Sequence, residues 1–324
     1  MSRPLRVEYA GAFYHVINRG NAREKIFYGD KDRDRFLQYL AVASERFSII
    51  IKSYCLMTNH YHLLIQTPEP NLSAAIQWVN VSYATYLNKK RRRSGHLFQG
   101  RFKSILVQAD EYLPHVSRYI HLNPVHAGMV KKPDDYLWSS YCALIGRIKA
   151  PHWLETNGLL SKFGRNRKQA IKGYRDYVEK ADIEKMEYPY EHLVGGFILG
   201  NAGFVNWVKK AFLAVRRDER EVPQLMQLKP KVSIEKVLLA VCEEFGVSED
   251  HILVKGKKAN KARDLAIYLA RDISGETCKK LGEYFGGITG PGITMRYNRF
   301  INEMKHDKRL KGKIAKIKKQ LVIF

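Results

Sequence analysis

The sequence is poor in cysteine, has no long apolar run and carries few acidic residues for its length. Its 4 cysteines are scattered among 324 residues without a Cys-x-x-Cys pair, so neither a disulfide framework nor a zinc ribbon is indicated. No apolar run approaches the ~20 residues of a membrane span. The N-terminus also lacks the apolar core of a signal peptide. We therefore expect a cytoplasmic protein without a membrane partner.

The shortage of acidic side chains leaves a large positive charge. Lys and Arg number 56 against 32 Asp and Glu, which gives a net charge of +24. Such an excess favours a polyanionic partner, and because no amphipathic membrane helix is in sight, we expect nucleic acid. A chain of 324 residues is also too long for one small core, so two or three domains are expected.

A predicted strand at residues 57–67 carries the first candidate site residues, His60 and His62. Alternate side chains of a strand share a face, so these two histidines project together while Tyr61 and Leu63 point into the core on the other side. Two adjacent imidazoles form half of a metal site. The alternative is a pair of structural histidines with satisfied hydrogen bonds.

A predicted helix at residues 110–124 carries the second set. Asp110 is the expected N-cap, and Pro124 restricts the residue before it, so we expect Asn123 at the helix end. Tyr119 and Asn123 stand four residues apart and therefore one turn apart, where a hydroxyl and an amide oxygen can converge. A half-buried aromatic residue beside a C-terminal asparagine is the alternative for this helix.

Taken together, His60-Tyr61-His62 and the run Tyr119-Ile120-His121-Leu122-Asn123-Pro124 resemble a known family. This family comprises the HUH single-strand DNA endonucleases with one catalytic tyrosine, and the resemblance is specifically to the REP-associated tyrosine transposases. The resemblance covers roughly residues 5–145, and Tyr61 is a mild departure at the middle of the first motif. It implies a divalent metal ion, Mg²⁺ or Mn²⁺, held by His60, His62 and Asn123, and Tyr119 as the nucleophile. It also implies cutting and rejoining of single-stranded hairpin DNA through a 5′-phosphotyrosine intermediate.

The fold class predicted for this part is α+β, a ferredoxin-like antiparallel sheet with helices on one side, which the resemblance also implies. His15 lies on the first strand and faces away from Tyr14 and Val16. We expect it to be structural, and the alternative is that it approaches the active site. The pattern predicts strands at residues 11–18, 48–56, 57–67 and 100–108 and helices at residues 31–46 and 71–89.

Basic side chains gather near the end of the second helix and on the last strand. We expect the run at residues 89–93 to form a loop beside Arg101 and Lys103, which share a strand face. A basic loop near a phosphodiester site favours single-strand binding, although a solvated face is the alternative. The candidate contacts of the run are Lys89, Lys90, Arg91, Arg92 and Arg93.

Residues 151–230 have a looser pattern with several glycines, and we expect a connecting region with short helices. The sheet should therefore be complete before about residue 145 and the catalytic domain should end near residue 150. Residues 306–324 are almost wholly Lys, Arg and apolar spacers, which predicts a basic tail that binds phosphates without reading sequence.

Residues 231–305 predict an all-α helix-turn-helix domain, because two helical stripes flank Gly286-Gly287. The segment is similar to the C-terminal DNA-binding domain of the replication initiator DnaA. It departs from that pattern at residues 288–291, Ile-Thr-Gly-Pro, where the family carries Arg-Asp-His-Thr. The resemblance therefore implies duplex DNA binding but not the initiator's target, and a helical packing domain is the alternative. The matching residues are Lys261-Ala262-Arg263, residues 266–271, Leu281-Gly282 and Phe285-Gly286-Gly287. The candidate DNA contacts are Lys257, Lys258, Arg263, Arg296 and Arg299.

Two other functions stay open at this point. A host-retained DNA-binding regulator could keep the fold and the helix-turn-helix without transposing, although the intact histidines, tyrosine and asparagine argue against lost chemistry. Alternatively, zinc-dependent hydrolysis with water as nucleophile would make Tyr119 dispensable.

Overall fold

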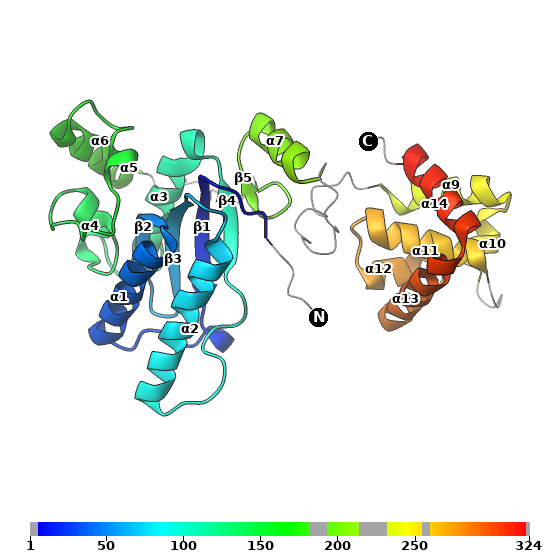
Figure 1. Ribbon diagram of the computed structural model, residues 1–324, viewed down its shortest axis with the longest axis horizontal. Helices are drawn as coiled ribbons and strands as arrows, with labels where there is room; N and C mark the ends of the chain where they lie inside the picture. The colour runs from blue at the N-terminus through cyan, green and yellow to red at the C-terminus, as the bar shows by residue number, and fades with distance from the viewer. Residues whose placement is uncertain (1–5, 182–192, 214–231, 255–259, 322–324) are drawn as a thin grey trace. The chain divides into compact units, whose positions relative to one another are not determined.

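The computed structural model describes residues 6–181, 193–213, 232–254 and 260–321. The chain divides into two units, Met1–Met226 and Gln227–Phe324. The described residues of each unit form a separate core. The first is an α+β unit and the second is all α (Figure 1). The predicted fold class is confirmed, with two corrections to the sheet and its helices.

The sheet has five strands rather than four, and it is mixed. Its order is β2-β3-β1-β4-β5, with antiparallel pairs except for the parallel pair of β4 and β5. Because β5 has only two residues in a glycine-broken stretch, its pattern was too short to predict. The strands are β1 (Ala12–Arg19), β2 (Ile50–Leu56), β3 (His60–Thr67), β4 (Lys103–Val107) and β5 (Ile198–Leu199). The expectation that the sheet is complete before residue 145 is therefore wrong.

Helices cover both faces of the sheet, not one. α1 (Asp30–Phe47) and α2 (Leu72–Arg91) lie side by side on one face (Figure 1). There the Tyr61 ring lies 4.8 Å from the Phe36 ring. On the other face α3 (Ala109–His126) shares a core with Leu64 and Ile105. Alternate residues of β3 are buried on both faces, so the strand has no solvent-facing side.

The segment after residue 150 belongs to the first unit. Buried residues of α5 (Asn157–Leu160) and α6 (Arg167–Glu179) join the core beneath α3. Tyr174 makes the closest links, since its hydroxyl lies 2.7 Å from Ser117 Oγ and 2.6 Å from His121 Nδ1. The short helices predicted here are present, but they are part of a packed unit. The remaining helices are η1 (Asn21–Arg23), η2 (Pro133–Asp135), α4 (Tyr141–Leu144) and α7 (Ala202–Leu213).

The second unit is a bundle of helices, several of which have an N-terminus capped by a side chain. Side chains of Ser233, Asn260, Thr277 and Thr289 accept the backbone N–H three residues further on, which satisfies helix-end donors. Gly286 and Gly287 take positive φ angles of 79° and 74° at the turn between α12 and α13. The helices are α9 (Ile234–Phe245), α10 (Glu249–Leu253), α11 (Lys261–Ile273), α12 (Cys278–Tyr284), α13 (Gly290–His306) and α14 (Lys308–Leu321).

The segment predicted as a basic tail is the helix α14. Leu310, Ile314 and Ile317 are buried in the core of the second unit, at the spacing of one helix face. Lys313 donates from Nζ to the Glu244 backbone oxygen at 3.1 Å, which holds α14 against α9. The apolar spacers between the lysines therefore decide the structure, and the tail prediction is wrong. No helix in the described part of the chain is long and apolar enough to cross a bilayer.

Candidate functional site

Pairing of β1, β3 and β4 brings polar residues together at one end of the sheet. Directly paired residues of antiparallel strands share a face. Arg19 pairs with His60, and Ile17 pairs with both His62 and Lys103. Arg19, His60, His62 and Lys103 therefore lie on the face that α3 covers.

His62 makes its closest contact with a residue that was predicted to be structural. Its Nδ1 lies 2.9 Å from His15 Nε2, and the two rings stack with centroids 5.1 Å apart. Both imidazoles are buried. The sequence signal was present, because His15 points to the opposite face from Tyr14, but pairing with Leu64 of β3 was needed to place it beside His62.

Burial keeps all three imidazoles neutral. Desolvation, with Lys103 as a second cause, lowers the pKa of His15 to about 3. Desolvation and then Arg19 lower the pKa of His60 to about 4. The pKa of His62 is well below its usual range, because of burial and then of the neighbouring His15 and His60. A neutral imidazole offers a nitrogen lone pair, which is the form that binds metals.

The hydrogen bonds of His60 and His62 show which imidazole nitrogens are suited to bind a metal ion. His60 Nδ1 donates to Asn59 Oδ1 at 2.7 Å, so Nε2 carries the lone pair. His62 Nε2 is buried and has no hydrogen-bond partner among the described residues. A buried nitrogen without a partner costs free energy unless a ligand satisfies it, so this atom fits a metal ion. The described residues contain no group of three His, Cys, Asp or Glu side chains that could hold a metal.

Tyr119 reaches this site from α3, and Asn123 lies one turn further along the same helix. The Tyr119 ring stands edge-on to the His62 ring, with centroids 5.8 Å apart, and is half-buried. Asn123 donates from Nδ2 to the Tyr119 backbone oxygen at 2.8 Å. Because the amide nitrogen is used in this bond, Oδ1 is the atom of Asn123 that can act as a ligand.

Both predicted ends of this helix are corrected. Gln108, not Asp110, is the N-cap, and the helix continues through Pro124 to His126. Asn123 is therefore not the last helical residue. The buried residues Ile120 and Leu122 hold this turn in the core, so packing outweighs the steric preference of the residue before proline.

The basic run ends a helix instead of forming the expected loop. Lys89, Lys90 and Arg91 form the last turn of α2, and Arg92 follows with a positive φ of 50°. Lys90 is paired with Asp32, and Arg93 lies 3.0 Å from Glu24. Lys89, Arg92, Arg101 and Lys103 are exposed.

The residues predicted to contact DNA in the second unit differ in how exposed they are. Arg263 is buried and donates to the backbone oxygens of Val254 and Phe285, so it packs the core instead of facing a phosphate. Arg296 and Arg299 donate to Asp264 at 2.8 and 2.7 Å and remain partly exposed. Lys257 and Lys258 lie outside the described residues.

Comparisons with known proteins match the two units separately. The model of the IS200-like transposases matches residues 9–123, and the model of the bacterial DnaA helix-turn-helix matches residues 234–289. These matches confirm both resemblances drawn from the sequence. Neither model covers the segment between them.

Individual relatives cover parts of the chain. A Haemophilus influenzae protein described as a REP-associated tyrosine transposase is 30% identical over 98 residues, which are 27% of this chain and 56% of that protein. The replication initiator DnaA of Campylobacter jejuni is 28% identical over 101 residues, 31% of this chain and 23% of that protein. The chain thus spans about half of the first relative's length and about a quarter of the second's.

A solved REP-associated tyrosine transposase bound to a REP hairpin also aligns with the chain. The alignment has a TM-score of 0.40 and 18% identity, and it covers 48% of this chain and 92% of that one.

Proposed function

We propose that the chain is a single-tyrosine HUH DNA transposase that cuts and rejoins single-stranded hairpin DNA. The observation that carries this proposal is the Tyr119 ring, whose centroid lies 5.8 Å from that of His62. In the described part of the chain the buried Nε2 of His62 has no hydrogen-bond partner. A nucleophile stands beside a nitrogen suited to a metal. The match of residues 9–123 to the IS200-like transposases supports the same function.

The metal ligands in this proposal are His60 Nε2, His62 Nε2 and Asn123 Oδ1. Each has its other polar atom engaged: His60 by Asn59, His62 by His15, and Asn123 by the Tyr119 backbone. Such partners fix the orientation and tautomer of a ligand. A divalent ion held there, Mg²⁺ or Mn²⁺, would neutralise charge on the phosphate oxygens.

Tyr119 attacks the phosphorus, so its oxygen forms a bond to the 5′ phosphate while the bond to the 3′ oxygen breaks and leaves a 3′-hydroxyl. A phenol has a pKa near ~10, so the site must favour the phenolate. Lys103 and Arg19 contribute positive charge, since they lower the pKa of His15 and His60 respectively. The phosphotyrosine conserves the bond energy, so a later 3′-hydroxyl can accept the strand without ATP.

The second unit supplies duplex binding in this proposal, through partly exposed Arg296 and Arg299 on α13. The match of residues 234–289 to the DnaA helix-turn-helix supports this role. We place the catalytic domain in the first unit up to residue 213, instead of ending it near residue 150, because α6 and β5 belong to its core and sheet.

The test is incubation of the full chain with Mn²⁺ or Mg²⁺ and a labelled single-stranded hairpin oligonucleotide, followed by denaturing electrophoresis. We expect a covalent protein–DNA adduct that requires the metal. DNA binding without cleavage would favour a host-retained regulator. Cleavage without an adduct would favour hydrolysis by water.

A further inference from the structure

A cavity lies on the face of the sheet opposite the histidines. Strand pairing separates the two, since Asn18 pairs with Tyr61 on the face of α2, whereas Arg19 pairs with His60 on the face of α3. The cavity has a volume of about 770 Å³ and lies between α2 and residues 95–102. That volume is in the range of small-ligand pockets, roughly 300 to 1,000 Å³.

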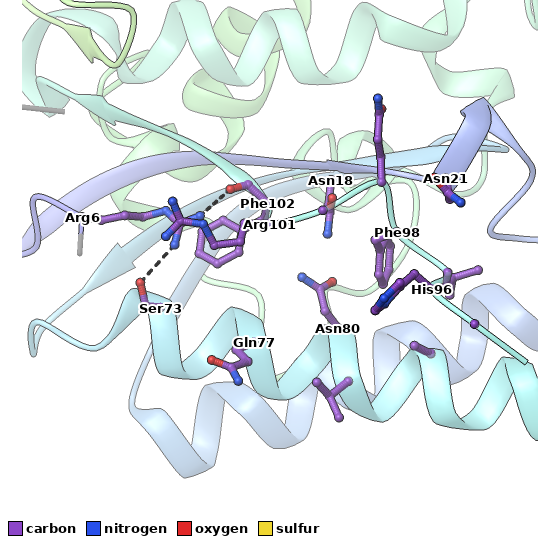
Figure 2. A pocket seen from close by; sticks show the side chains of 16 residues that line it. Arg6, Asn18, Asn21, Ser73, Gln77, Asn80, His96, Phe98, Arg101 and Phe102 are labelled. Atoms are coloured by element: carbon purple, nitrogen blue, oxygen red, sulfur yellow. Dashed lines mark hydrogen bonds between the residues drawn. The ribbon is translucent and has the colours of Figure 1, made fainter. Parts of the chain in front are cut away.

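One end of the cavity is cationic. Figure 2 shows Arg6 and Arg101 gathered there with Phe102. The Arg6 guanidinium lies 3.8 Å from the Phe102 ring centroid and donates to the Phe102 backbone oxygen at 2.6 Å and to Ser73 Oγ at 3.3 Å. These contacts fix its plane. Burial, and then the charge of Arg101, lower the pKa of Arg6 to about 10.

The electrostatics at this end favour an anionic ligand. Two guanidinium groups of like charge repel each other, and an anion between them would relieve that repulsion. Glu8 is the nearby carboxylate, and it accepts from the backbone N–H and the hydroxyl of Ser73. Arg6 and Arg101 line the cavity, whereas Glu8 is not among its lining residues.

The middle of the cavity presents amide groups with a defined orientation. Asn18 Oδ1 accepts from the Arg19 backbone N–H at 3.0 Å, and Asn80 Oδ1 accepts from the Tyr61 hydroxyl at 2.7 Å. With both oxygens engaged, the NH₂ groups of Asn18 and Asn80 are the parts suited to a ligand. Figure 2 shows these two side chains pointing toward each other from the sheet and from α2. Donors in this arrangement suit the acceptors on the edge of a nucleobase.

The other end of the cavity is aromatic. His96 and Phe98 lie there together (Figure 2), and Phe98 is half-buried. Its ring stands edge-on to Tyr61, with the centroids 6.2 Å apart and the planes at 88°. Tyr61 therefore braces the Phe98 ring from the core. Unpaired bases stack on aromatic side chains of this kind.

We propose that this cavity binds one unpaired nucleotide of the single-stranded DNA substrate. Its phosphate lies at Arg6 and Arg101, its base edge at Asn18 and Asn80, and its ring on Phe98. The proposal rests on the proposed function for the identity of the substrate. Because Asn18 and Arg19 are neighbours on β1, one strand presents the cavity on one face and the cleavage site on the other.

The experiment measures binding of full-length Phe98→Ala and Arg101→Gln to a labelled hairpin oligonucleotide with a single-stranded flank, by fluorescence anisotropy without metal. Phe98→Ala should weaken binding roughly 5- to 150-fold, the range for loss of one base stack. Arg101→Gln should lower the salt dependence of binding by ~0.7 in log-log slope, the loss of one single-strand phosphate contact. Arg165→Gln, an exposed arginine that does not line the cavity, is the matched control.

Abasic substitutions along the flank identify the nucleotide. At one position the abasic oligonucleotide should bind wild-type protein more weakly, and Phe98→Ala should then cause no further loss. If the variants keep the melting temperature of the wild type and bind every oligonucleotide as it does, the proposal is wrong. If the wild-type protein still forms the adduct, that result contradicts only the cavity proposal and not the proposed function. If the wild-type protein forms no adduct but the variants bind as expected, the proposed function is wrong and the cavity proposal is supported.

Discussion

At the scale of single residues, Tyr119→Phe tests whether Tyr119 is the proposed nucleophile. Tyr119→Phe keeps the ring beside His62 and removes only the hydroxyl. We expect the covalent adduct to disappear while hairpin affinity and the melting temperature stay within error of wild type, because only the oxygen attacks. Denaturing electrophoresis and anisotropy measure the two properties on the same preparation. Cleavage that persists in this variant would identify water as the nucleophile.

His15 gives a test of the proposed metal site that leaves its proposed ligands unchanged. His15→Leu removes the partner of His62 Nδ1, and we expect Mn²⁺ affinity measured by calorimetry to fall about 10- to 100-fold, as for other partners of metal ligands.

His15→Gln is the matched control, because its amide oxygen can still accept from His62 Nδ1. It should retain most of the Mn²⁺ affinity. Equal affinities for the Leu and Gln variants would show that the contact between His15 and His62 has no part in metal binding.

At the scale of elements, α6 shows that the chain beyond residue 150 belongs to the core of the first unit. The Tyr174 hydroxyl lies within hydrogen-bond distance of both Ser117 Oγ and His121 Nδ1. Tyr174→Phe leaves both partners buried, so we expect the free energy of unfolding to fall by about 1–3 kcal/mol in urea titrations. Tyr177→Phe is the control, because its hydroxyl bonds to His115 in an exposed position. A change as large for Tyr177→Phe would contradict this account of the α3–α6 contact.

The element α14 gives a second test, because a basic tail and a packed helix predict opposite results. Ile317 is fully buried, so Ile317→Ala should lower the free energy of unfolding of the second unit by about 2–5 kcal/mol. Lys319→Ala, at an exposed position of the same helix, should change it by less than about 0.5 kcal/mol. Thermal melts that do not distinguish the two variants would support the original tail prediction.

At the scale of the whole molecule, the separate cores of the two units suggest a division of labour. A chain ending at Met226 should still form the adduct with a short hairpin oligonucleotide, since it keeps His60, His62, Tyr119 and Asn123 together with β5. Its duplex affinity should fall, and the log-log salt slope should flatten by ~0.9 for each lost phosphate contact. Adduct yield and duplex binding across a salt series check both results.

A chain ending at residue 150 is the informative comparison for that truncation. It lacks α6 and β5, so we expect it to be unfolded and inactive. The chain ending at Met226 could instead fail to cleave the short substrate and keep the duplex affinity of the full chain. In that case cleavage and duplex binding are not divided between the two units as proposed.

The sequence by itself determined the features that depend on local spacing. The period of two in β3 put His60 and His62 on one face, and the four-residue step put Tyr119 one turn from Asn123. Helical stripes and glycines located the second unit, whose caps at Ser233 and Asn260 follow from residue type.

Only the tertiary structure decided the contacts between distant residues. His15 meets His62 across 47 positions and Ser117 meets Tyr174 across 57, and no local pattern encodes either pairing. β5 joins the sheet through a pair of residues too short to show a period, and Arg263 is buried because the backbone oxygens of Val254 and Phe285 surround it. The local sequence around these histidine, serine, tyrosine and arginine side chains is equally compatible with exposure to solvent. They are buried because distant parts of the chain pack against them.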